Sequence, residues 1–206
     1  MFKRIALVLI SVLIAQSAYA KNFVAGEHYK VLPTPVATRD KNKIEVVELF
    51  WYGCFHCHTM EPVISNWERR LAGDVDFHAM PAVWMRPMGL HAKVYYTAKA
   101  LGVLDRSHKA FFKKINVDQN KMSSESAIAE FFKTQGIDGK TFTKVFNSAS
   151  VNRQVAFSKQ RGLAYGMERT PEIVVNGKYR VSGGTHEEKL QVADYLIAKE
   201  RAAMAK

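Results

Sequence analysis

Only two cysteines occur in the 206-residue chain, and two residues separate them in the sequence Cys54-Phe55-His56-Cys57. A thiol attacks other molecules as its thiolate, and a second thiol one helical turn away can close a disulfide with the first. A bridge this local closes only a short loop and adds little to the stability of a fold. The pair therefore indicates thiol chemistry in preference to a structural disulfide.

The residues around this pair predict a strand followed by a helix. Residues 44–51 form a β-branched and aromatic run that is typical of a buried strand. From Cys54 to about residue 73, apolar residues recur at three- and four-residue spacings, which predicts a helix. Cys54 would then lie at a helix N-terminus, where unpaired N–H groups and the helix dipole favour a thiolate. Cys57 would be less exposed and within reach of Cys54.

Two histidines beside the cysteines leave alternatives open. His56 would place a donor or a positive charge beside the sulfur, and the alternative is an exposed helix residue without a role. His58 completes the C-x-x-C-H pattern of covalent haem attachment, in which it would be an axial ligand. The strand-to-helix context favours thiol exchange over haem. The other histidines are dispersed, and no second cysteine pair could complete a zinc site, so we expect no metal.

The rest of the chain predicts a second strand, a run of helices and a hairpin. Residues 75–83 alternate like a strand and complete a right-handed βαβ unit. Helices are then expected at residues 90–101, 106–115, 124–135, 139–147 and 151–165, with N-caps at Ser123 and Asp138. Asn176-Gly177 between two apolar runs predicts a hairpin. Thr185 opens a capping box for a final helix, whose apolar face is Leu190, Ala193, Leu196 and Ile197.

These elements predict an α/β fold in which a mixed sheet is flanked by helices. We expect a first part of the sheet domain at residues 21–84, which holds the cysteine pair. A helical insertion follows at residues 85–165, and residues 166–206 return to the sheet domain.

The first twenty residues predict a cleaved signal peptide. Lys3 and Arg4 precede an apolar run, and Ala18 and Ala20 form an A-x-A cleavage site, so the mature chain would begin at Lys21. Cleavage would lower the formal net charge from +11 to +9. The basic residues of the mature chain are scattered, which favours a solvated surface over nucleic-acid binding.

Three features together resemble the DsbA family of periplasmic thiol oxidases. They are the stretch Val46 to Cys57, the helical insertion, and Thr170-Pro171 before the hairpin. The resemblance implies a thioredoxin-like fold with an inserted helical domain. It also implies a redox-active Cys54-Cys57 disulfide that works without a cofactor and is donated to reduced, unfolded exported proteins. Re-oxidation would then depend on a DsbB-type, quinone-linked membrane oxidase.

The resemblance also implies roles for individual residues. Cys54 would be the attacked sulfur and Cys57 the resolving one, while Pro171 matches a cis-proline that faces the dithiol and helps present substrate backbone. Glu48 aligns with an acidic residue beneath the site that could accept protons as the thiols react, and the alternative is a carboxylate that reaches solvent at the strand edge.

Two substrate-facing positions depart from the family pattern. Phe55 replaces a common proline between the cysteines, and Thr170 replaces a common valine before the cis-proline, as in disulfide isomerases. Isomerases generally dimerise through an added domain, for which the segment before the first strand is too short. We therefore expect a monomeric oxidase, with an isomerase or reductase as the alternative.

A chaperone-like peptide binder is a further alternative of a different class. It would bind peptides in an apolar groove near Phe55, Trp84, Met85 and Met88, and its dithiol would be incidental.

Overall fold

A computed structural model describes residues 23–205 of the chain. The predicted signal peptide and the mature start at Lys21 lie outside the described residues. Within residues 23–205, no helix combines the length and the apolar content needed to cross a bilayer.

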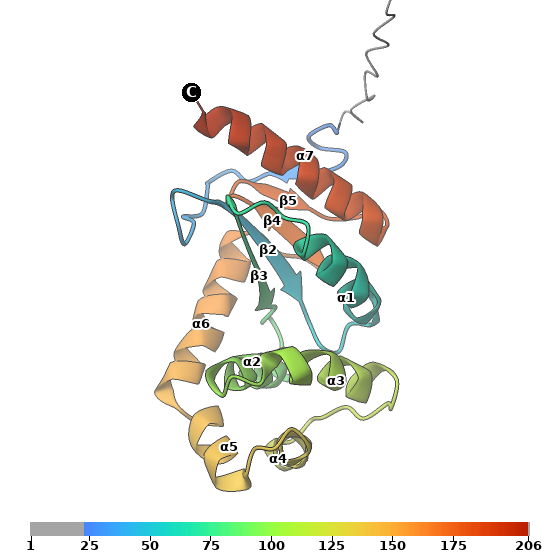
Figure 1. Cartoon of the computed structure of the whole chain (residues 1–206), viewed down its shortest axis with the longest axis vertical. Helices are drawn as coiled ribbons and strands as arrows, with labels where there is room; N and C mark the ends of the chain where they lie inside the picture. The colour runs from blue at the N-terminus through green and yellow to red at the C-terminus, as the bar shows by residue number, and fades with distance from the viewer. Residues whose placement is uncertain (1–22, 206) are drawn as a thin grey trace, which may run out of the picture.

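A five-stranded mixed sheet forms the centre of the molecule (Figure 1). Its strands are β1 (Lys30–Val31), β2 (Ile44–Phe50), β3 (Val75–Pro81), β4 (Glu172–Val175) and β5 (Tyr179–Val181). The strand order is β1-β5-β4-β2-β3, with β2 and β3 parallel and the other neighbours antiparallel. Every residue of β2 is buried, because β2 has a strand on each side and a layer of helices on each face.

Helices cover both faces of the sheet. One face packs against α1 (Phe55–Glu68) and α7 (His186–Met204) through a core that includes Ile44, Met60 and Leu196. The other face packs near α6 (Ala149–Ala164) around Val47, Leu49 and Tyr165. In Figure 1, α1 and α7 lie on one side of the sheet and α6 on the other. The alternation along β2 thus divides its side chains between two cores.

Four further helices pack beyond the carboxyl ends of β2 and β3 (Figure 1). They are α2 (Arg86–Ala100), α3 (Leu104–Asn116), α4 (Glu125–Thr134) and α5 (Gly139–Phe146). Their aromatic core, with Phe111 and Phe132 fully buried, continues into Phe50 and Tyr52 next to the cysteines. The predicted fold class, a thioredoxin-like fold with inserted helices, is confirmed. The exact domain boundaries stay a prediction, since this core is shared.

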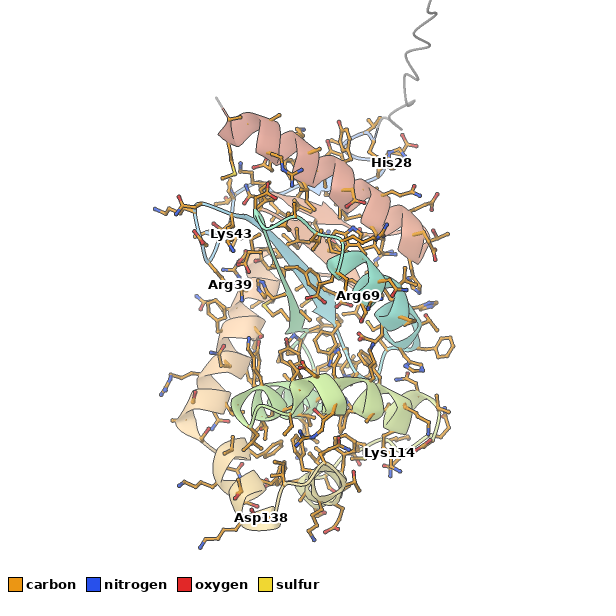
Figure 2. The ribbon with its side chains drawn as sticks, viewed as in Figure 1. His28, Arg39, Lys43, Arg69, Lys114 and Asp138 are labelled. Carbon is orange, nitrogen blue, oxygen red and sulfur yellow. The ribbon has the colours of Figure 1, made fainter. Side chains whose placement is uncertain are left out.

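Local signals in the sequence account for most of the observed elements. Asn176 and Gly177 both adopt positive φ at the hairpin turn, and Thr185 and Glu188 form the predicted capping box. Asp138 caps α5, at the labelled position in Figure 2. The predicted N-cap Ser123 is wrong, because the Ser124 side chain is the one that accepts from the Ala127 N–H.

A buried ion pair fixes α6 to the sheet. The Arg161 guanidinium donates to the Glu45 carboxylate at 2.7 Å and to the Ala37 carbonyl oxygen at 2.9 Å. Arg39, labelled in Figure 2, joins the same group through its backbone N–H to Glu45 and its side chain to Asp76. Because the Glu45 side chain is fully buried, its charge depends on these partners.

Arg161→Met should therefore destabilise the fold strongly, since it leaves the Glu45 carboxylate buried beside only one remaining cation. We expect a loss of about 3–5 kcal/mol in the free energy of unfolding, measured with urea. The control is Lys133→Met, which breaks an exposed pair with Glu130 and should cost at most about 1 kcal/mol. Equal effects of the two substitutions would contradict this account.

Candidate functional site

The reactive thiol lies where β2 passes into α1. Cys54 is the N-cap of α1 with extended backbone dihedrals, and no side chain caps the helix. Because Cys54 is the N-cap, the N–H groups of the first turn and the positive end of the helix dipole are directed at its sulfur. The first turn contains no acidic residue that would compete for them. This position follows from the sequence, because the buried strand ends at Phe50 and a turn at residues 51–53 precedes the helix.

The two thiols differ in exposure and in acidity. Cys54 is partly exposed and Cys57 is fully buried, and both are free thiols in the structure. The hydrogen bond from the Cys57 thiol lowers the pKa of Cys54 to about 5, against the opposing effect of burial. The Thr170 side chain and the backbone N–H groups of Cys57 and His56 also contribute to this lowered pKa. Burial, with the hydrogen bond and charge of Cys54, raises the pKa of Cys57 well above its ordinary value.

This asymmetry defines different chemical roles for the two sulfurs. At neutral pH the partly exposed Cys54 is mostly a thiolate, whereas the buried Cys57 keeps its proton. The His56 side chain is exposed, with its ring centroid 6.4 Å from that of His186. Its contribution to the Cys54 thiolate comes through its backbone N–H, so the predicted side-chain role of His56 stays a prediction.

A cis-proline loop faces the reactive thiol across the site. The Thr170-Pro171 bond is cis, as the resemblance implies. The Cys54 sulfur lies 3.4 Å from the Thr170 carbonyl oxygen, to which it donates a hydrogen bond when it is protonated. Strand β4 begins directly after Pro171 and pairs with β2 so that Glu172 lies opposite Leu49. This register brings a loop from the second part of the chain to the end of β2.

Glu48 lies beneath the site on the α1 side of β2, with only 3 % of its surface exposed. Burial, and then the neighbouring charges of Glu61 and Glu68, raises its pKa to about 8. Glu48 is therefore mostly protonated at neutral pH, and its ionised form raises the pKa of Cys57. The alternative of a carboxylate that reaches solvent at the strand edge is wrong, because Glu48 is 3 % exposed and lies in the wall of a cavity of about 400 Å³.

The predicted cluster of exposed apolar residues is only partly present. Phe55 is 61 % exposed, and Trp84 and Met85 are exposed as well. Met88 is buried in the core, so it cannot form part of a surface groove. A separate groove of about 700 Å³ lies beside Gly53, between the turn after β2, the start of α2 and the segment before α4.

The geometry of the dithiol disfavours haem attachment. A haem held by two thioether bonds needs both sulfurs at its edge, and Cys57 is fully buried. The ring of His58 packs against the Phe112 ring at a centroid distance of 6.0 Å, which makes it part of the inner surface of α1.

Within residues 23–205, one group of side chains has donor atoms spaced closely enough for a metal ion: Glu45, Asp76 and His78, with these atoms within 4.8 Å of one another. Both carboxylates are already bound by arginines, Glu45 by Arg161 and Asp76 by Arg39. The group is therefore an ion-pair network of the fold.

Sequence reasoning missed a pair of side chains next to the dithiol. The His108 ring shares a hydrogen bond of 2.7 Å with the Tyr52 hydroxyl and contacts the Glu61 carboxylate at 3.4 Å. His108 comes from α3 and was counted among the dispersed histidines. The spacing of Glu61, four residues after Cys57 on one helix face, was the available signal.

The strand-to-helix dithiol, its unequal thiols and the facing cis-proline on a thioredoxin-like sheet define a thiol:disulfide oxidoreductase. Comparison with known proteins identifies the family. A family model described as "DSBA-like thioredoxin domain" matches residues 74–193. The thiol:disulfide interchange protein DsbA of Pseudomonas aeruginosa is 38 % identical over 204 residues, covering 98 % of this chain and 97 % of its own.

Two further matches agree with this result. The DsbA of Azotobacter vinelandii is 41 % identical over 192 residues, covering 92 % of this chain and 90 % of its own. The crystal structure of Pseudomonas aeruginosa DsbA superposes with a TM-score of 0.86 at 39 % identity, covering 89 % of this chain and 97 % of that one. The chain belongs to the DsbA family.

The lowered pKa of Cys54 predicts how the stability of the two redox forms depends on pH. A folded pKa of about 5 lies below the unfolded value of ~8.5, so the thiolate stabilises the reduced fold fully above ~8.5. This contribution falls on acidification and is lost below about pH 5. The opposing four-residue disulfide loop stabilises the oxidised form by only ~2 kcal/mol.

We therefore expect the reduced form to be the more stable at pH 7, with an advantage that shrinks as the pH falls. Urea unfolding of both forms across this pH range measures it. Reduced Cys54→Ser protein is the control and should lose this pH dependence. An oxidised form that is more stable at every pH would overturn the prediction.

Proposed function

We propose that this protein oxidises pairs of thiols in exported polypeptides by donating a disulfide between Cys54 and Cys57. The observation that carries the proposal is the difference between the two thiols, one an accessible thiolate of low pKa and one buried and protonated. A reduced form stabilised in this way gives up electrons reluctantly, which makes the disulfide form a strong oxidant.

The reaction proceeds by two thiol exchanges. A substrate thiolate attacks the Cys54 sulfur, the Cys54–Cys57 bond breaks, and its electron pair goes to the Cys57 sulfur, which takes up a proton. A second substrate thiolate then attacks the first substrate sulfur and releases the Cys54 thiolate. The substrate loses two electrons and two protons, of which one stays on Cys57 and one passes to solvent. No cofactor takes part in this scheme.

Surrounding residues are assigned supporting roles. The Glu48 carboxyl, protonated at neutral pH, is the group beneath the site that can supply the Cys57 proton. Pro171 and the Thr170 carbonyl present backbone groups to an extended substrate, and the exposed Phe55 ring offers it apolar surface. His56 completes the rim of the site.

The family and the N-terminal sequence support a proposal about the cellular setting. We propose that the chain is exported by its N-terminal signal peptide to the periplasm, where it acts as a monomer. An oxidant that donates its disulfide must regain one, and a DsbB-type, quinone-linked membrane oxidase is the proposed donor. We propose no nucleic-acid partner.

Whether the protein is an oxidase or an isomerase depends on the reduction potential of the Cys54–Cys57 disulfide. The low pKa of Cys54 favours an oxidase, whereas Thr170 before the cis-proline resembles the isomerases. Equilibration with a glutathione redox buffer measures the potential and separates the two functions.

Substitution of each cysteine should give a different result. Cys54→Ser should reduce the oxidation of an unfolded dithiol protein to background, because the attacked sulfur is lost. Cys57→Ala should instead accumulate mixed disulfides through Cys54, because the resolving thiol is absent. Mass spectrometry of trapped complexes identifies the linked cysteine, and substrate captured on Cys57 of the Cys54→Ser protein would reverse the assigned roles.

Turnover should require a membrane partner. We expect reduced protein to be re-oxidised by membrane vesicles that contain a DsbB-type oxidase and a quinone, and to stay reduced with vesicles lacking that oxidase. Thiol alkylation followed by gel mobility reports the redox state. Equal re-oxidation by both kinds of vesicle would count against the proposed partner.

A further inference from the structure

The cavity beside Glu48 is a polar chamber between the dithiol helix and the helical insertion. It has a volume of about 400 Å³, is lined by side chains from α1, β2, β3, α2 and α3, and opens to solvent beside the exposed Glu68, Asp105 and Lys109. A polar cavity of this size holds several water molecules. Its titratable side chains are Glu48, Glu61, Glu68, His78, Tyr95, Asp105, His108 and Lys109.

Within residues 23–205, His108 is the insertion side chain that contacts residues on both sides of the cysteine pair. Its Nδ1 atom shares a 2.7 Å hydrogen bond with the hydroxyl of Tyr52, two residues before Cys54. Its Nε2 atom lies 3.4 Å from a carboxylate oxygen of Glu61, one turn after Cys57. The second Glu61 oxygen accepts from the Ser65 hydroxyl at 3.1 Å.

The surrounding side chains hold the His108 ring in place. The His108 side chain is only 14 % exposed, and the rings of Phe50 and Phe112 contact it edge-on at 5.2 and 5.1 Å between centroids. Burial raises the pKa of Glu61, but the hydrogen bond and charge of His108 outweigh it and the net shift is downward. Glu61 is thus an anionic acceptor that keeps the His108 ring in this position.

The reaction needs a proton path to this region. Cys57 and Glu48 are buried, yet the Cys57 sulfur gains a proton when the disulfide opens and loses it when the disulfide closes. Imidazole is the side chain best suited to proton exchange near neutral pH. Among the described residues that line the chamber, His108 combines an imidazole with a carboxylate partner.

We propose that His108, paired with Glu61, relays protons between solvent and Glu48 across this chamber, and so governs the step in which Cys57 reacts. His108 acts through Glu48, so it is a positioning and relay residue. The inference rests on the proposed thiol exchange. When the disulfide closes, the protonated Glu48 carboxyl gives its proton to the neutral His108 ring and so to solvent, and the resulting Glu48 carboxylate takes the proton of Cys57. Opening reverses this order.

Oxidation of the reduced protein by glutathione disulfide separates the two steps. In the first, the Cys54 thiolate attacks a glutathione sulfur, forms a mixed disulfide and releases a glutathione thiolate. In the second, Cys57 loses its proton and attacks Cys54, which releases the second glutathione thiolate. Only the second step needs the relay. Rapid acid quenching and mass spectrometry measure both rates.

His108→Gln is the decisive variant, because glutamine can hydrogen-bond to Tyr52 and Glu61 but cannot carry the proton. We expect the second step to slow at least ~10-fold, with a changed pH profile, while the first step keeps the rate of the unsubstituted protein. His91→Gln is the matched control. His91 is also buried and bonds to Trp51 at 3.1 Å, but it lies outside the chamber, so both rates should stay unchanged.

A second variant distinguishes the loss of proton transfer from a change in folding. His108→Ala opens space in the chamber, and added imidazole should restore the second step in a concentration-dependent manner. An unchanged second step in His108→Gln, or equal slowing of both steps without rescue by imidazole, would overturn the relay. Failure of the unsubstituted protein to perform either step would instead reject the proposed thiol exchange.

Discussion

The unequal burial of two thiols one turn apart on α1 is the constraint on which the site depends. Cys54 occupies the N-cap, where the chain turns into the helix, and Cys57 faces the sheet. The same helix therefore stabilises one thiolate and buries the other sulfur. Because β2 ends just before the turn, its length sets where the helix begins, and its pairing with β4 places the cis-proline loop opposite Cys54. The packing of the sheet thus determines the chemistry of the dithiol.

Two acidic residues on β2 show how burial leads to different outcomes. Glu45 and Glu48 are three positions apart, so their side chains project to opposite faces of the sheet. Glu45 meets Arg161 and the Arg39 backbone and belongs to an ion-pair network. Glu48 has no cation of this kind among its described contacts, and its high pKa keeps it neutral. One carboxylate is held as an ion pair within the fold, and the other is mostly neutral beside the dithiol, where we propose that it exchanges a proton.

Much of this arrangement could be predicted from the sequence where the signals are local. The buried strand, the turn at Asn176-Gly177 and the capping box at Thr185 each depend on residues close together in the chain. Strand β1 was not predicted, because a strand of two residues is too short to show an alternating apolar pattern. Its pairing with β5 is a tertiary contact that the local sequence does not indicate. The N-cap of α4 was placed one residue early, because Ser123 and Ser124 satisfy the same rule.

In the candidate site, too, local features could be predicted from the sequence and long-range contacts could not. The cysteine pair is visible in the sequence, whereas the contact between His108 and Tyr52 spans 56 residues and no spacing rule indicates it. The cis bond before Pro171 was implied only by the family resemblance, since nothing in the local sequence separates it from an ordinary trans bond.

The loop that faces Cys54 is supplied by a distant part of the chain. The thiol and the Thr170 carbonyl are separated by 116 residues, and the whole helical insertion lies between them. During synthesis, which runs from the N-terminus, the dithiol emerges long before the loop that faces it. A chain interrupted before β4 would carry both cysteines but not the Thr170 carbonyl that Cys54 contacts. The site described above is therefore complete only in a polypeptide that has been synthesised beyond β4.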